Sequence, residues 1–181
     1  MKQKSFHKSI LIICKYRKLF KVTNRVFRRD NNLKKIINIL DFHILVSEIN
    51  NSRYYMKKIV KTINAPAPIG PYSQAVKIGN TLYTSGQIAI NPKTRKLEMD
   101  SIEIETHQVM KNMEAVLNDV NMTFDDVVKT SIFLLNMDNF SLINEIYGQY
   151  FTSNFPARET IEVARLPKDV NLEISMIAIK D

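Results

Sequence analysis

The stretch VVKTSIFLL, residues 127–135, is apolar on both faces and rich in β-branched side chains. Such a segment is typical of a strand buried inside a sheet rather than at its edge. A helix with one apolar stripe is predicted before it, because apolar residues recur there at steps of three and four: Val109, Met113, Val116, Leu117 and Val120. The two segments together predict a helix packed on a sheet.

A second helix is predicted after this strand. Asp138 is a suitable residue to cap its N-terminus, and Pro156 is expected to end it. Its apolar side is formed by Phe140, Ile143, Tyr147, Tyr150 and Phe151. Asn144 flanks this stripe, where it is either a site residue or a buried structural amide.

The remaining segments predict strands. Two short candidates near residues 75–78 and 81–85 are separated by Gly79-Asn80, which is a hairpin signal. Two more, near residues 158–165 and 170–179, end the chain. With one further strand expected before all of these, at a position that the sequence does not locate, the order is βββαβαββ, which predicts an α/β (α+β) domain.

The last two strands carry charged residues that could do chemistry. In the final strand, Glu173 alternates with apolar residues and faces away from the helices, and Arg158 and Thr160 share one side of the strand before it. We expect both charges on the face that a single chain leaves exposed. A direct hairpin between these strands would set Glu162 opposite Glu173, a like-charge pair that sheets avoid. Another strand can therefore lie between them, which leaves open whether Arg158 and Glu173 share a site.

Charge is distributed unevenly along the 181 residues. Residues 1–55 hold 13 of the 26 Lys and Arg residues and 3 of the 18 acidic ones, a net charge of +10, whereas residues 56–181 carry −2. All glycines and prolines follow residue 65. We therefore expect one domain at 56–181 behind a basic extension at 1–55, and the domain's charge argues against nucleic acid as its partner.

The extension resembles an organelle presequence, because its first 29 residues hold ten basic and no acidic side chains. An alternative is that Met56 is the working start. The location expected is accordingly the cytoplasm or the mitochondrion, with another organelle possible. Part of the extension has helical spacing, at Ile36, Ile37, Leu40 and Ile44. No run reaches the roughly 18 apolar residues of a membrane-spanning helix, so no membrane partner is expected.

Several kinds of site are excluded by residue type. The single cysteine, Cys14, lies in the extension, and His7, His43 and His107 are too scattered for the usual zinc spacing, so no metal is expected. P-loop, nucleophile-elbow and dinucleotide motifs are absent. A site without a cofactor remains. Ser85-Gly86 at a strand end could offer a backbone N–H to a small ligand, or could be an ordinary bulge.

Four strings in this domain resemble the RidA (YjgF) family of enamine and imine deaminases. They are APAPIGPYSQ at 65–74, TSGQ at 84–87, FPAR at 155–158 and VARLPKD at 163–169, followed by Glu173. The resemblance spans residues 56–181. It implies a chorismate-mutase-like mixed sheet with two helices on one face, and a homotrimer with active sites between subunits, which would explain the polar outward face.

The resemblance also implies roles for individual residues. Arg158 would bind the substrate carboxylate and Glu173 would serve the hydrolytic water. The pocket would be lined by Tyr72, Ser85, Gly86 and Asn144, together with Thr160, which stands where bacterial members often have cysteine. The implied reaction converts 2-aminoacrylate-type enamines and imines into 2-keto acids and ammonia without a cofactor. Two other functions stay open: a ribonuclease or translation inhibitor, and a ligand-binding trimer without turnover.

Overall fold

The computed structural model describes His43 and residues 56–180, and residues Tyr54–Asp181 form one compact unit. The presequence-like segment and its helical stripe lie outside the described residues. In the described part of the chain, no helix is long and apolar enough to cross a membrane.

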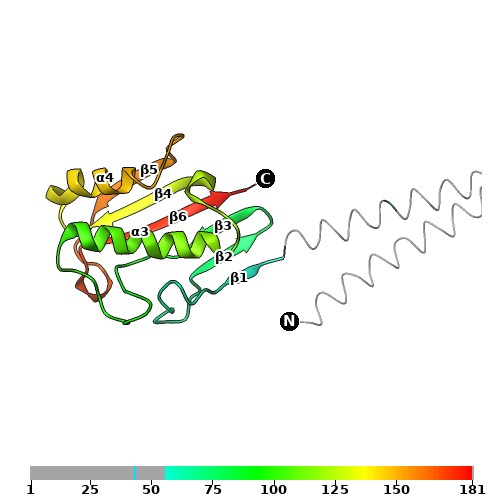
Figure 1. The fold of residues 1–181 in the computed structure, drawn as a ribbon, viewed down its shortest axis with the longest axis horizontal. Coiled ribbons are helices and arrows are strands. Elements are labelled where there is room, and N and C mark those ends of the chain that lie inside the picture. Colours follow the sequence, from blue (N-terminus) through cyan, green and yellow to red (C-terminus); the bar gives the residue numbers. More distant parts are fainter. Residues whose placement is uncertain (1–42, 44–55, 181) are drawn as a thin grey trace, which may run out of the picture. The chain divides into compact units, whose positions relative to one another are not determined.

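Six strands form one mixed sheet (Figure 1). Its spatial order is β1-β2-β3-β6-β4-β5, in which only β4 and β5 run parallel. The strands are β1 (Lys58–Val60), β2 (Ala75–Ile78), β3 (Thr81–Thr84), β4 (Val127–Leu134), β5 (Ala157–Glu162) and β6 (Leu172–Ile179). With the helices α3 (Ile102–Asn118) and α4 (Phe140–Gly148), the chain order is the predicted βββαβαββ.

Both helices cover the same face of the sheet, as Figure 1 shows. Ser101 caps α3 by accepting a hydrogen bond from the Ile104 N–H, because four backbone donors at a helix start have no partner inside the helix. The predicted stripe of α3 is fully buried against the sheet. β4 lies inside the sheet, between β6 and β5, as its two-sided apolar pattern predicts.

The start and the end of α4 differ from the predictions. Asn136, not Asp138, provides the side-chain cap: its Oδ1 accepts from the Asp138 N–H and begins a 3-10 turn, Met137–Asn139, that leads into α4. The helix ends at Gly148, well before Pro156. Phe151 nevertheless stays buried, because its ring packs on that of Tyr147 with centroids 4.7 Å apart.

β4 separates the last two strands of the chain, so they do not form the hairpin that would set Glu162 opposite Glu173. Glu173 pairs with Phe133 of β4 and Glu162 with Leu134, so the two carboxylates do not face each other. Leu172, Ile174, Met176 and Ala178 of β6 are buried under the helices, and Glu173 points to the opposite face as predicted.

The face of the sheet opposite the helices is covered by no described helix and mixes polar with apolar side chains. Glu173 and a cluster of Lys129, Ser131 and Glu159 lie on it, with both β4 side chains hydrogen-bonded to the Glu159 carboxylate. Five of its apolar side chains are between 38% and 50% exposed: Ile59, Ile78, Tyr83, Ile161 and Ile179. The sheet face that was expected to be polar therefore also exposes apolar side chains.

Candidate active site

Arg158 lies on the helix-covered side of β5, which corrects the prediction that it faces outward. In the parallel ladder it is the neighbour of Thr130, whose side chain is fully buried under α4. Neighbouring residues in a ladder point to the same face, so the Arg158 side chain rises toward α4. Its guanidinium carbon lies 5.1 Å from the ring centre of Tyr147 and 5.8 Å from that of Phe140.

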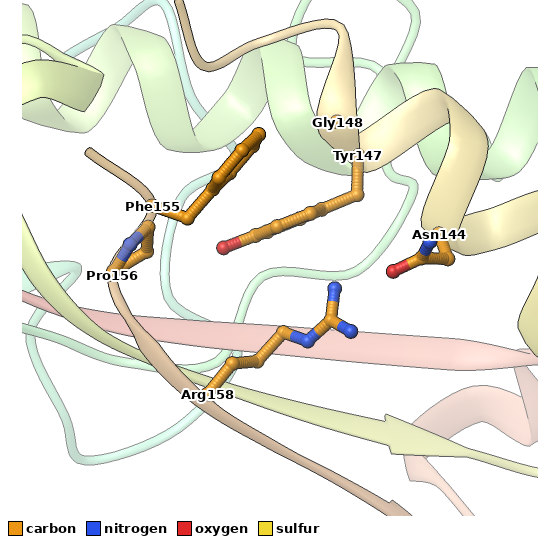
Figure 2. Close-up of a pocket in the computed structure, with 6 residues that line it drawn as sticks. All are labelled: Asn144, Tyr147, Gly148, Phe155, Pro156 and Arg158. Carbon is orange, nitrogen blue, oxygen red and sulfur yellow. The ribbon is translucent and has the colours of Figure 1, made fainter. Parts of the chain in front are cut away.

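A cavity of about 410 Å³ opens beside this guanidinium (Figure 2). Asn144 is exposed and turns its amide toward Arg158, so it is not a buried structural amide. The lining residues are Asn144, Tyr147, Gly148, Phe155, Pro156 and Arg158. Among the described residues Arg158 has no carboxylate partner, so its N–H groups are free to bind an anion from the cavity.

Thr160 follows Arg158 on the same side of β5, because it pairs with the buried Ile132. Its hydroxyl oxygen is buried and has no hydrogen-bond partner in the described part of the chain. We call Asn144, Tyr147, Arg158 and Thr160 the arginine half-site.

Glu173 lies on the other face of the sheet, against Gly86. The Gln87 N–H donates to the Ile174 carbonyl (2.8 Å) and the Ile174 N–H to the Gln87 carbonyl (3.1 Å), which brings the two segments together. A Cβ at position 86 would overlap the Glu173 carboxylate, so any larger residue here would displace the Glu173 side chain. Burial raises the pKa of Glu173, because the charged form loses hydration.

The backbone at Ser85-Gly86 has one donor to offer, which was one of the two alternatives left open by the sequence. The Ser85 N–H donates to the Gln74 carbonyl (2.9 Å), and the Ser85 hydroxyl donates to the Ser73 carbonyl (2.6 Å). The N–H of Gly86 has no partner within the described residues. Tyr72 and Gly86 line the same small pocket. We call Tyr72, Ser85, Gly86 and Glu173 the glutamate half-site.

One chain therefore contains two half-sites rather than one complete site. The sheet separates Arg158 from Glu173, since they point to opposite faces. The sequence patterns missed Tyr147, Phe155 and Pro156 as cavity residues. Tyr147 was assigned only to the core stripe, and the one available signal was that FPAR places Phe155 and Pro156 directly before Arg158.

Among the described residues, no group of three or more His, Cys, Asp or Glu side chains is placed to hold a metal ion. The polar groups of both half-sites are instead donors and acceptors for a small organic molecule. A guanidinium, a primary amide, a hydroxyl, a free backbone N–H and a carboxylate can bind and protonate or deprotonate such a molecule without a cofactor.

Comparison with known proteins agrees with this fold. The model of the family described as Endoribonuclease L-PSP matches residues 62–180. A RutC family protein of Pyrococcus horikoshii is 47% identical over 126 residues, 70% of this chain and 100% of its own length. A Dermatophagoides farinae protein named 2-iminobutanoate/2-iminopropanoate deaminase is 46% identical over 123 residues, 68% of this chain and 96% of its own.

Solved structures share the architecture. A Rid family protein of unknown function from Yersinia pestis is 49% identical with a TM-score of 0.68, covering 69% of this chain and 100% of that one. E. coli TdcF with bound serine is 36% identical with a TM-score of 0.66, covering 68% and 99%. A mixed sheet with two helices on one face and polar half-sites on both of its sides thus defines an α+β protein of the L-PSP class. Within that class, the chain belongs to the RidA (YjgF) family.

Proposed function

We propose that this protein is a hydrolytic deaminase that converts 2-aminoacrylate-type enamines and imines into 2-keto acids and ammonia. The observation that carries the proposal is the unpaired guanidinium of Arg158 at an open cavity. A guanidinium without a carboxylate partner can hold the carboxylate of an imino acid through two parallel, charge-assisted hydrogen bonds. The name of the Dermatophagoides farinae relative supports the same chemistry.

Glu173 is suited to the proton transfers of this reaction. Water adds to the imine carbon while the Glu173 carboxylate accepts one of its protons. That proton passes to the imine nitrogen, which gives a carbinolamine. The hydroxyl proton of the carbinolamine then passes through Glu173 to the same nitrogen, the C–N bond breaks as the C=O bond forms, and ammonia and a 2-keto acid leave. The raised pKa of Glu173 helps, because a general base works best when its pKa approaches the working pH. The free Gly86 N–H can donate to the substrate beside it.

We further propose a homotrimer in which each active site combines the arginine half-site of one chain with the glutamate half-site of another. The opposite orientation of Arg158 and Glu173 supports this, since one chain cannot bring them together. The partly exposed apolar side chains on the open sheet face support it too, because an apolar patch of this kind is commonly buried in an assembly.

A coupled assay tests the activity. A serine or threonine dehydratase generates the enamine, and the rate of keto-acid release is measured with and without this protein. The control is the same chain carrying both Arg158→Ala and Glu173→Gln at equal concentration. We expect acceleration by the natural chain only. Equal rates with the natural chain and the double variant would refute the proposal.

A ligand-binding protein without turnover is the second candidate, favoured by the serine bound in the E. coli TdcF structure. It predicts that calorimetry detects binding of serine or a keto acid while the coupled assay shows no acceleration. A ribonuclease activity, suggested by the name of the family model, receives less support, because residues 56–181 carry a net charge of −2 and RNA binding draws on basic surface.

A further inference from the structure

Tyr147 stands between the helical layer and the arginine cavity, and its hydroxyl is anchored. The phenol donates a hydrogen bond to the Thr130 hydroxyl oxygen (3.1 Å), and both side chains are almost fully buried, with exposed fractions of 3% and 0%. Thr130 belongs to β4, Tyr147 to α4 and Arg158 to β5. One buried hydrogen bond therefore fixes the ring at the point where three elements meet.

The face of this ring is turned toward the Arg158 guanidinium, as Figure 2 shows from the side of the cavity. The pKa of Tyr147 is raised, chiefly by burial, although the hydrogen bond to Thr130 and the charge of Arg158 act in the lowering direction. The phenol is therefore neutral at ordinary pH, and it meets Arg158 as an aromatic face rather than as a phenolate. A guanidinium within about 6 Å of a ring centroid is attracted by the electron-rich face.

The way in which Arg158 is held affects whether its N–H groups can bind a substrate. A carboxylate partner would also hold Arg158, but it would occupy the same N–H donors that an anionic substrate needs. The guanidinium carbon instead lies over the rings of Tyr147 and Phe140, and no described carboxylate reaches it. An aromatic ring attracts the guanidinium without neutralising its charge, so an anionic substrate meets no competing carboxylate among the described residues.

We propose that Tyr147, fixed by Thr130, is a positioning residue that holds the Arg158 guanidinium in the orientation in which it receives the substrate carboxylate. This inference rests on the proposed function. It adds a residue that acts through Arg158 and that contributes to substrate affinity without taking part in the hydrolysis.

Three variants test it: Tyr147→Leu removes the ring, Tyr147→Phe keeps the ring and removes the hydroxyl, and Thr130→Val removes the acceptor. The matched control is Phe124→Leu, because Phe124 is a buried ring of the same aromatic cluster that contacts Tyr150 and Phe151 but not Arg158. The readouts are kcat and KM for imine hydrolysis and the Kd of 2-oxobutanoate by calorimetry.

For Tyr147→Leu we expect KM and Kd to rise roughly 3- to 30-fold, the range that a lost cation–π contact implies, with little change in kcat. Tyr147→Phe and Thr130→Val should raise them less, because the ring remains. Phe124→Leu should lower stability without changing Kd. In an Arg158→Ala background, Tyr147→Leu should add nothing further, because the group that it positions is gone.

Incorporating a trifluorinated phenylalanine at position 147 isolates the aromatic contribution and covers the case in which Tyr147→Leu fails to fold. Fluorination weakens the negative ring face with little change in shape, so Kd should rise relative to Tyr147→Phe. An unchanged Kd would overturn the inference, as would equal effects of Tyr147→Leu and Phe124→Leu. Failure of the proposed function looks different, since then the natural chain shows no imine hydrolysis and Arg158→Ala does not alter 2-oxobutanoate binding.

Discussion

Arg158 and Arg165 are two arginines near the same end of the chain in opposite situations. Arg165 is exposed and paired with Asp169 at 2.7 Å, whereas Arg158 has no carboxylate partner among the described residues and faces a cavity. We expect Arg158→Ala to cost about 2 to 5 kcal/mol of substrate binding in the transition state, a fall of roughly 30- to several-thousand-fold in kcat/KM. Arg165→Ala should leave activity unchanged, because an exposed ion pair contributes little.

Light scattering on the same samples separates catalysis from assembly. If Arg158 served only to join subunits, Arg158→Ala would dissociate the protein and activity would return at high protein concentration. An assembled and fully active Arg158→Ala protein would contradict the proposed mechanism.

Glu173 gives a prediction about pH. Burial raises its pKa, so the carboxylate becomes protonated at a higher pH than an exposed glutamate. Activity should therefore fall as the pH decreases through this raised value. Glu173→Gln should lower kcat by roughly 100- to 10,000-fold and leave keto-acid binding intact, because the amide cannot accept the proton.

The pH dependence of folding stability that Glu173 causes has the opposite sign to that of an ion-paired acid. A raised folded-state pKa means that ionisation of Glu173 costs folding free energy. The neutral carboxyl therefore makes its favourable contribution to stability at low pH, and this contribution is lost as the pH rises through the raised pKa. Glu173→Gln should consequently be more stable than the natural chain at neutral pH. Urea denaturation at two pH values measures this, and a less stable variant at neutral pH would count against burial as the cause.

Gly86 is the residue with the least room. In Gly86→Ala the new methyl group would overlap the Glu173 carboxylate, so we expect a loss of about 1 to 3 kcal/mol of stability and a displaced Glu173 with reduced kcat. Gly148→Ala is the control for stability, since a Cβ there meets no atom within 4 Å, and it should gain about 0.5 to 1 kcal/mol. Equal behaviour of the two variants in thermal unfolding would contradict the packing described at Gly86.

At the scale of elements, the spacing of apolar residues and the residue types at turns predicted most of the fold. The stripe of α3, the central position of β4 and the alternation of β6 are strong signals because each involves many residues whose burial repeats regularly. β1 was expected in the strand order but not located, since three residues are too few for a period to show. The end of α4 was misplaced because Phe151 packs into the core from beyond the helix.

The orientation of Arg158 could not be predicted from β5 itself. Its burial pattern shows no clean alternation, because β5 is an edge strand with only β4 beside it. Which side chains of such a strand face the helices depends on its register with the neighbour, here Arg158 beside Thr130. Gly86 could be named from a local string and Asn144 from its place beside the apolar stripe of α4, both supported by the family resemblance. The division into two half-sites required the register.

One side chain links α3 to the segment that follows Gly86. The fully buried Asn112 amide donates to the carbonyls of Ile88 and Ile90, both at 2.9 Å. Asn112→Ala leaves both carbonyls unsatisfied, so we expect a loss of about 2 to 4 kcal/mol by urea denaturation. Asn118→Ala, exposed on the same helix, should change stability by less than about 0.5 kcal/mol. A loss for Asn112→Ala no larger than that of the control would show that this link is weak.

For the whole molecule, the two half-sites on opposite faces of one sheet make a prediction about mixtures. Arg158→Ala and Glu173→Gln chains should each be inactive alone. After unfolding and refolding together at equal amounts, about a quarter of the sites in random trimers combine an intact Arg158 from one chain with an intact Glu173 from another, so about a quarter of the activity should return.

The control mixture contains natural chain and the double variant, in which intact pairs come only from natural chains. No recovery from the two single variants, while each still assembles, would mean that both residues act within one chain, which the sheet geometry opposes.

The overlap between position 86 and the Glu173 carboxylate also constrains how this sequence can evolve. A methyl group at 86 would lie 2.7 Å from the Glu173 Cγ as well as in the space of its carboxylate. Aspartate also has a Cγ at this place, so shortening the acid at 173 does not by itself make room for alanine. We therefore expect descendants of this chain to keep glycine at 86 for as long as the side chain of residue 173 occupies this place.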